Sequence, residues 1–262
     1  FYVIFIVLLE IFMEKINGCL LNVEVEDFKL LKENPKEFWK GVTIVGAGAF
    51  SNLDLFEIEI PEGVTDIERA AFKNCNFLNY VKLPKSLKGI GEFAFENCSR
   101  LKSINIPNSV MIIREACFAR CKNLGKINFS ENLFYIGNYA FFGCSAIKEL
   151  KLGANVSKLG LSAFANCFNM KKVLLPKCLQ EIPKNAFRNC VNLTEINIPT
   201  NVSKISKSAF CGCEKLKKMN FLSFNGDFQA TMLHGDLKEL KKSVLEIETN
   251  QEKDMFYCER MM

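Results

Sequence analysis

Apolar and polar positions along most of this chain follow a pattern that recurs about every 23 residues. Each unit starts with a Leu-like residue, then places two apolar residues at alternate positions before a Pro, as in Leu78, Val81, Leu83 and Pro84. A period of two is typical of a strand with one buried face. Pro ends such a strand because it cannot donate a hydrogen bond to the neighbouring strand. We therefore predict a short strand at the start of each unit.

The second half of the unit has mixed spacing, as in Leu87, Ile90, Ala94 and Phe95. It predicts a turn, a second short extended segment and a tight bend, where the small Ala lets the chain close on itself. The bend is marked by eight Phe residues: Phe50, Phe72, Phe95, Phe118, Phe141, Phe164, Phe187 and Phe210. Seven of them are followed three residues later by Cys: Cys75, Cys98, Cys121, Cys144, Cys167, Cys190 and Cys213.

A fixed period of this length is the signature of stacked repeats, because one unit cannot bury its apolar face alone whereas neighbours on both sides can. We predict a curved solenoid of about eight rungs, with short parallel strands on one face and helical flanks at both ends. Ser130 and Gly153 stand where other units have Pro. We expect the strands before these two residues to be slightly longer than the others.

From about Val42 to about Phe221, the Leu-Pro step, the Ile-x-x-x-Ala-Phe step and the Cys resemble the BspA-like class of leucine-rich repeats. The resemblance implies a leucine-rich-repeat fold. It also implies an adhesin or a protein-binding scaffold, of a kind found on bacterial surfaces and in protozoan parasites. It carries over no individual functional residue.

The repeats divide the chain into four segments. These are an apolar N-terminal segment at 1–23, a capping segment at 24–41, the solenoid at 42–222 and a C-terminal helix and tail at 223–262. The capping segment predicts a helix interrupted at Asn34-Pro35, because Pro disfavours helix in the residue before it. Its apolar residues should cover the first rung: Phe28, Leu30, Leu31, Phe38 and Trp39. In the tail, helical spacing predicts an amphipathic helix that closes the last rung, with Leu237, Leu240, Val244, Leu245 and Ile247 on its apolar side.

The first 13 residues are apolar but include Glu10. They are too few for a membrane-spanning helix, which needs about 20 apolar residues. They also lack the basic start and small-residue cleavage site of a signal peptide. The segment is either a targeting sequence or an extension before a start at Met13. The sequence thus leaves both a cytoplasmic and a cell-surface or secreted location open.

Composition narrows the choice of partner. The net charge is +5, with Lys and Arg dispersed over the repeats, whereas a nucleic-acid-binding domain usually concentrates basic residues on one face. We therefore expect no nucleic-acid partner. The 24 Phe residues do not change this, since a third of them belong to the repeated bend.

Seven of the twelve Cys residues share one phase of the repeat and should form a column with one thiol per rung. Parallel side chains in register seldom reach the dihedral angle of a disulfide, so we predict free, buried thiols that act as small apolar residues. Free thiols favour a reducing compartment. Cys178, in a turn, is the thiol we expect to be most exposed.

No catalytic or cofactor-binding motif was found. The single His, His234, lies outside the repeats. Cys211 and Cys213 lack the second pair of ligands that a structural zinc site needs. We predict no enzyme, no cofactor and no metal.

The outward positions of the first strands vary in size and charge while the inward positions barely change. This pattern is that of a recognition surface on a fixed scaffold. The candidate partner-binding residues are Tyr80, Lys82, Lys126, Lys148, Lys151, Lys171, Lys172, Lys217 and Lys218. We predict protein binding or adhesion through this strand-lined face, to a protein partner whose identity the sequence leaves open; the clustered lysines would suit an acidic one. The alternative is an intracellular scaffold that recruits a partner through its C-terminal helix.

Overall fold

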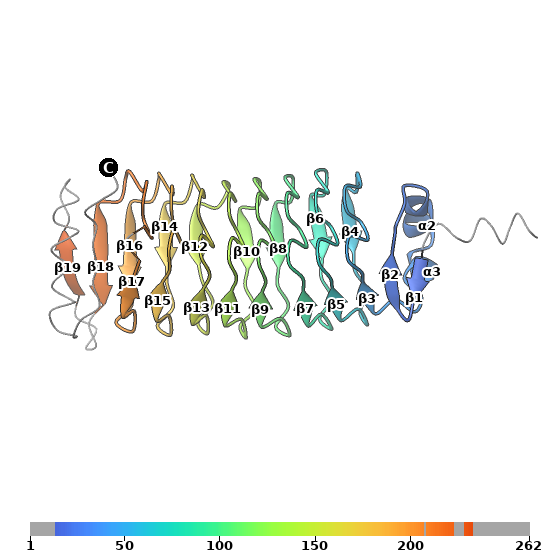
Figure 1. Cartoon of the computed structure of the whole chain (residues 1–262), viewed down its shortest axis with the longest axis horizontal. Coiled ribbons are helices and arrows are strands. Elements are labelled where there is room, and N and C mark those ends of the chain that lie inside the picture. Colours follow the sequence, from blue (N-terminus) through green and yellow to red (C-terminus); the bar gives the residue numbers. More distant parts are fainter. Residues whose placement is uncertain (1–13, 207, 223–227, 233–262) are drawn as a thin grey trace, which may run out of the picture.

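A computed structural model describes residues 14–206, 208–222 and 228–232. The chain winds into an elongated solenoid in which each turn, or rung, carries two strands (Figure 1). We number rungs by their Phe residue, so that rung 1 holds Phe50 and rung 8 holds Phe210. The solenoid predicted from the 23-residue period is therefore confirmed.

The two strands of each rung lie in two rows along the stack (Figure 1). The front row, from rung 2 onward, consists of β4 (Glu57–Glu59), β6 (Tyr80–Lys82), β8 (Ser103–Asn105), β10 (Lys126–Asn128), β12 (Glu149–Lys151), β14 (Lys172–Leu174), β16 (Glu195–Ile198) and β18 (Lys218–Leu222). The back row consists of β3 (Ile44–Val45), β5 (Asp66–Ile67), β7 (Gly89–Ile90), β9 (Ile112–Ile113), β11 (Tyr135–Ile136), β13 (Lys158–Leu159), β15 (Glu181–Ile182) and β17 (Lys204–Ile205).

Neighbouring strands within the repeats pair in parallel, and each residue lies beside its counterpart 23 residues away. In the front row, Glu57 pairs with Tyr80 and Lys172 with Glu195. In the back row, Tyr135 pairs with Lys158. Both extended segments of the predicted unit are thus present, and their register follows the sequence period.

Neither row is one continuous sheet among the described residues. The front row divides into β4-β6, β8-β10 and β12-β14-β16-β18-β19, and the back row into three sheets that include β9-β11-β13. Between rungs 5 and 6, therefore, the back strands β11 and β13 pair while the front strands β10 and β12 do not. The slot that Leu83 and Leu152 fill in other rungs holds Phe129 in rung 5. The centroids of the Phe129 and Phe141 rings lie 5.7 Å apart in an edge-to-face arrangement. The break coincides with this larger side chain.

The expectation of longer strands before Ser130 and Gly153 is wrong. Strands β10 and β12 each have three residues. The reason lies in the turn that follows. The N–H of Val156 donates to the carbonyl of Gly153, as the N–H of Val64 does to Pro61. The turn thus forms without Pro and ends the strand at the same place.

The eight Phe rings form a continuous stack through the centre of the solenoid. Successive ring centroids lie 4.8 to 5.9 Å apart and successive planes differ by 10° or less. Rings from Phe50 to Phe187 are fully buried, and only the last, Phe210, is partly exposed. Buried aromatic rings contribute much of the stability of a core, so this stack links every rung to the next.

The Cys column runs beside the Phe stack and joins consecutive rungs by hydrogen bonds. Each thiol donates to the carbonyl oxygen of the Phe in the preceding rung, for example Cys98 to Phe72 and Cys121 to Phe95, both at 3.1 Å. The cysteines that the structure describes are all free. The prediction of a buried thiol column is confirmed, and the hydrogen bonds explain why a small donor occupies this slot.

The residue directly before each Cys of the column has a left-handed backbone conformation. Asn fills this position in most rungs, with φ near +60° at Asn74, Asn97 and Asn189. Asn tolerates this conformation better than other non-Gly residues. The side chains also form a ladder, in which the Nδ2 of Asn74 donates to the Oδ1 of Asn52 at 2.8 Å. Arg120 interrupts the ladder with φ of 61°.

The N-terminal cap is helical, as predicted. Helices α2 (Asp27–Glu33) and α3 (Pro35–Phe38) meet at Asn34, whose side chain accepts from the N–H of Glu37. Phe38 and Trp39 are buried against the Phe50 ring, with centroids at 6.3 Å in both cases. Before the helices, strands β1 (Glu14–Ile16) and β2 (Cys19–Leu21) extend the back row, because β2 pairs in parallel with β3.

At the other end, β18 pairs with an antiparallel strand, β19 (Phe228–Met232). The sequence analysis did not predict this strand. The amphipathic helix predicted for the C-terminal tail lies outside the described residues, as do His234 and Cys258.

Candidate protein-binding surface

The outward side of the front row, which we call the front face, is built by alternation. The middle residue of almost every front strand is buried, and its two neighbours point outward. The exception is Ile127 in β10, which is partly exposed beside the break in the sheet. The sequence analysis therefore assigned the outward positions correctly, and the variable side chains do line one face.

The nine candidate residues fall into two separate regions of this face. Tyr80, Lys82 and Lys126 lie on β6 and β10. The other six lie in the rungs that follow β10, either in the front strands or directly before them: Lys148, Lys151, Lys171, Lys172, Lys217 and Lys218. The structure thus brings together only the second group.

Within that group the positive charge is less continuous than the sequence suggested. Glu149, Lys172, Glu195 and Lys218 pair in register along β12, β14, β16 and β18, so the sign alternates down this column. Thr194 lies between Lys171 and Lys217. Its backbone N–H donates to the carbonyl of Lys171, and its carbonyl accepts from the N–H of Lys217. The densest positive region is therefore at rungs 6 and 7.

The lysines of rungs 6 and 7 are free to meet a partner. Lys148, Lys151, Lys171 and Lys172 are exposed. The ion pairs among the described residues involve other basic side chains. Lys82 differs, because its ammonium lies 2.9 Å from the Glu59 carboxylate, and this hydrogen bond raises the pKa of Lys82.

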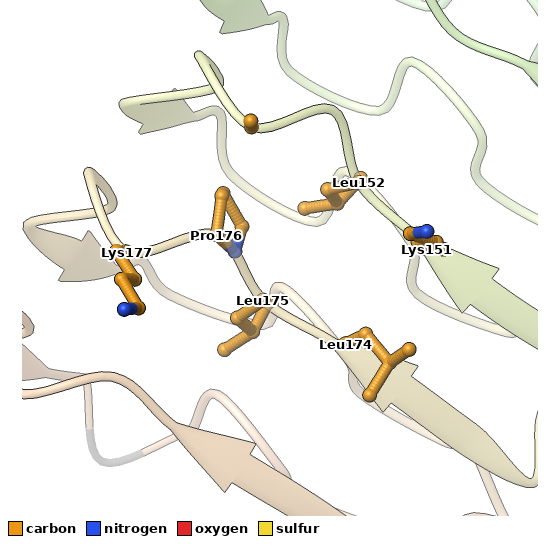
Figure 2. A pocket seen from close by; sticks show the side chains of 7 residues that line it. Lys151, Leu152, Leu174, Leu175, Pro176 and Lys177 are labelled. Carbon is orange, nitrogen blue, oxygen red and sulfur yellow. The ribbon is translucent and has the colours of Figure 1, made fainter. Parts of the chain in front are cut away.

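A shallow hollow of about 390 Å³ lies beside these lysines, between rungs 6 and 7 (Figure 2). Its apolar lining comes from Leu152, Leu174, Leu175 and Pro176, with lysines on either side. It is lined by Lys151, Leu152, Ala154, Leu174, Leu175, Pro176 and Lys177. The sequence analysis missed it. Two features of the sequence could have indicated the hollow. Gly153 stands where other repeats have Pro, and the apolar Leu174 stands at an outward position.

The front face of rung 2 has the opposite charge. Glu57, Glu59 and Glu62 are exposed there, next to a Phe56 side chain that is 58% exposed. The backbone N–H groups of Lys85 and Ser86 donate to the Glu62 carboxylate, and these bonds lower the pKa of Glu62. This acidic region was not predicted from the sequence, although Glu57 and Glu59 stand at alternate positions of the strand.

Apolar side chains are also exposed on the back row. Met111, Phe134, Tyr139 and Leu161 are each between 36% and 52% exposed. Phe134 and Met111 occupy the same repeat position in neighbouring rungs, since the N–H of Phe134 donates to the carbonyl of Met111. This patch was not predicted from the sequence, where only the outward positions of the front strands were assigned to a surface.

The thiols offer no reactive or metal-binding group in the core. Burial raises the pKa of Cys167 to about 12 and raises the pKa values of Cys98, Cys117 and Cys144 well above the ordinary value. A thiol with a raised pKa is a poor nucleophile and metal ligand. Within the part of the chain that the structure describes, no group of three or more His, Cys, Asp or Glu residues could hold a metal ion.

A rigid stack with a variable front face and a buried, unreactive core is the architecture of a protein-binding repeat solenoid. The chain belongs to the family described as BspA type leucine rich repeat region, which it matches in six copies over residues 43–169 and 112–237. Members of this family are typically binding modules rather than enzymes. A comparison with curated protein sequences found no match.

Solved structures that this chain resembles include leucine-rich repeat proteins of bacteria. The leucine-rich repeat protein of T. pallidum is 25% identical with a TM-score of 0.52, and the match covers 79% of this chain and 77% of that one. A leucine-rich repeat protein from Bacteroides ovatus is 29% identical with a TM-score of 0.38, and the match covers 68% of this chain and 64% of that one. This chain therefore spans less than two thirds of the Bacteroides ovatus protein.

Among the residues that the structure describes, no helix is long and apolar enough to cross a bilayer.

Proposed function

We propose that this chain binds another protein, or adheres to one, through its front face and without catalysis. The observation that carries the proposal is the set of exposed lysines at rungs 6 and 7, which are free of ion pairs with described residues and adjoin an apolar hollow. An interface of this kind suits an acidic partner, because opposite charges steer association while apolar contacts hold the complex.

The proposal is tested by charge reversal on the full chain. Lys148, Lys151, Lys171 and Lys172 are changed together to Glu, and the wild-type and variant chains are used as bait in extracts of candidate partner cells. Captured proteins are identified by mass spectrometry. We expect the variant to lose the wild-type partners, and we expect wild-type capture to weaken as salt is raised.

Lys158 and Lys184 provide the matched control, because both are exposed and lie outside the front row. Their reversal should leave capture unchanged. Loss of partners with the control but not with the front-face variant would contradict the proposal and place recognition on another face. If neither variant matters, deletion of the residues after Gly235 tests recruitment through the C-terminal tail.

A further inference from the structure

The front face has opposite charges toward its two ends. Rung 2 presents Glu57 and Glu62, and rung 7 presents Lys172 and Lys177. Neither Glu57 nor Lys172 takes part in an ion pair among the described residues, and both are exposed. The molecule therefore carries two complementary charged regions on one surface, which the rise of the solenoid holds apart.

The two regions also match in position within the repeat. Glu57 and Lys172 stand at the same place in their repeats, five repeats of 23 residues apart, and so do Glu62 and Lys177. The strand registers keep equivalent residues in columns along the stack. Acidic and basic groups are thus aligned along the same two columns.

This alignment has a consequence for two copies placed front face to front face. We place a two-fold axis in the interface, parallel to the strands and between β8 and β10. This axis reverses the order of the rungs in the second copy, but each column still faces the same column of that copy. Rung 2 of one copy then meets rung 7 of the other. Glu57 faces Lys172 of the second copy, Glu62 faces Lys177 of the second copy, and the symmetry repeats both pairs.

We propose that the chain associates with a second copy of itself in this antiparallel, front-to-front arrangement. The proposal rests on the proposed function, since it names a partner for the same surface. A two-fold contact of this type is self-complementary and closes after two copies. The result is a dimer rather than a fibre.

The remaining rungs are compatible with the arrangement. In the centre, the polar Ser103 and Asn105 of β8 face β10 of the second copy. Rung 3 meets rung 6, which places Tyr80 opposite Glu149, a carboxylate that can accept from its hydroxyl. The same pairing places Lys82 opposite Lys151, but the charge of Lys82 is already balanced by Glu59 at 2.9 Å.

The test is a charge swap in the full chain, measured by sedimentation velocity over a range of concentrations at low and high salt. Wild type should dimerise, with a dissociation constant that increases with salt. Glu57→Lys and Lys172→Glu should each raise the dissociation constant by about tenfold or more. Each change places two like charges opposite one another, and the symmetry of the dimer repeats this contact. The double variant should restore dimerisation, since the pairs are re-formed with reversed sign.

Lys158→Glu, in the back row, is the control and should leave the dissociation constant unchanged. Thermal melts of all variants show whether each chain is folded. A wild-type chain that is monomeric throughout, or a double variant no better than the single ones, would overturn the inference. A monomeric chain that still captures other proteins through its front-face lysines would leave the proposed function standing. The opposite outcome is also informative. If the double variant dimerises but the four-lysine reversal changes no capture, self-association stands and only the binding of other proteins is overturned.

Discussion

The thiol of Cys144 donates a hydrogen bond of 3.1 Å to the backbone carbonyl of Phe118, one rung earlier. The same carbonyl also accepts from the N–H of Cys121 in its own rung. Each Cys in the column therefore fastens two rungs together at the point where the chain bends, while its small side chain fits the space beside the Phe stack.

Replacing Cys144 by Ala removes this hydrogen bond without leaving the Phe118 carbonyl unpaired. We expect a loss of about 1 kcal/mol in the free energy of unfolding, measured by urea denaturation. Cys144→Val keeps no donor and adds volume in a packed core, and should cost about 1–3 kcal/mol. A Val variant as stable as wild type would show that the slot is not tightly packed.

The Phe stack predicts a graded series of Ala substitutions. Phe141→Ala, in the middle of the stack, should cost about 3–5 kcal/mol by the same measurement. From the sequence alone, Phe50→Ala is expected to cost less because an end rung has one neighbour. That premise is wrong, since Phe38 and Trp39 cover Phe50 on its outer side.

We therefore expect Phe50→Ala to cost as much as the central substitution. The smaller loss should occur at Phe210, which is only partly buried. If Phe210→Ala proved as costly as Phe141→Ala, the last rung would have to be covered as completely as the others.

Arg120 occupies a left-handed backbone position that is filled by Asn97 in the preceding rung and by Gly143 in the following one. Arg120→Asn should stabilise the chain by about 1 kcal/mol, because Asn adopts this conformation at lower cost. It would also place a carboxamide next to Asn97. The measurement is the midpoint of thermal unfolding. Asn189→Ala, which breaks a 2.8 Å bond to Asn166, is the control and should be destabilising.

The buried thiols predict a loss of stability at alkaline pH. Their pKa values are raised in the folded chain, to about 12 for Cys167 from an ordinary 9.0. The folded state therefore favours the neutral thiol. The contribution of these thiols to the free energy of unfolding is fully present below pH 9. It is lost as the pH rises from there through the folded pKa, by about 1.4 kcal/mol per pH unit for each such thiol.

Thermal melts between pH 7 and 11 would measure this loss. Variants that replace Cys121, Cys144 and Cys167 by Ala should be less stable at pH 7 but should lose stability more slowly above pH 9. Equal slopes for wild type and variant would mean that other groups cause the alkaline unfolding.

The architecture could be predicted from the sequence because each buried position recurs at one phase. Phe95 identifies its slot only because seven other rungs repeat it, and Cys98 because six other rungs do. The same reasoning failed where rungs differ. Gly153 was expected to lengthen a strand, but the backbone turn at Val156 forms regardless of Pro. The hollow beside Leu174 depends on how two adjacent rungs meet, which no single repeat encodes.

The surface was predicted less well than the core. The lysines were assigned to the correct face. However, the alternation of negative and positive charge between Glu149, Lys172 and Glu195 could be recognised only once the strand register placed them side by side. The acidic region around Glu57 was overlooked because exposed residues show no recurring phase. A single sequence therefore fixes which positions point outward, whereas their grouping requires the register and the turns.

The break between β10 and β12 affects the mechanics of the whole stack. Rungs 5 and 6 remain joined by β11 and β13 and by the Phe141 and Phe164 rings, whose centroids are 5.2 Å apart. Backbone pairing is thus continuous on one side of this junction and interrupted on the other. This junction should therefore bend about its back row as a hinge, whereas the junction between rungs 3 and 4 has no such hinge, because neither β6 and β8 nor β7 and β9 share a sheet there.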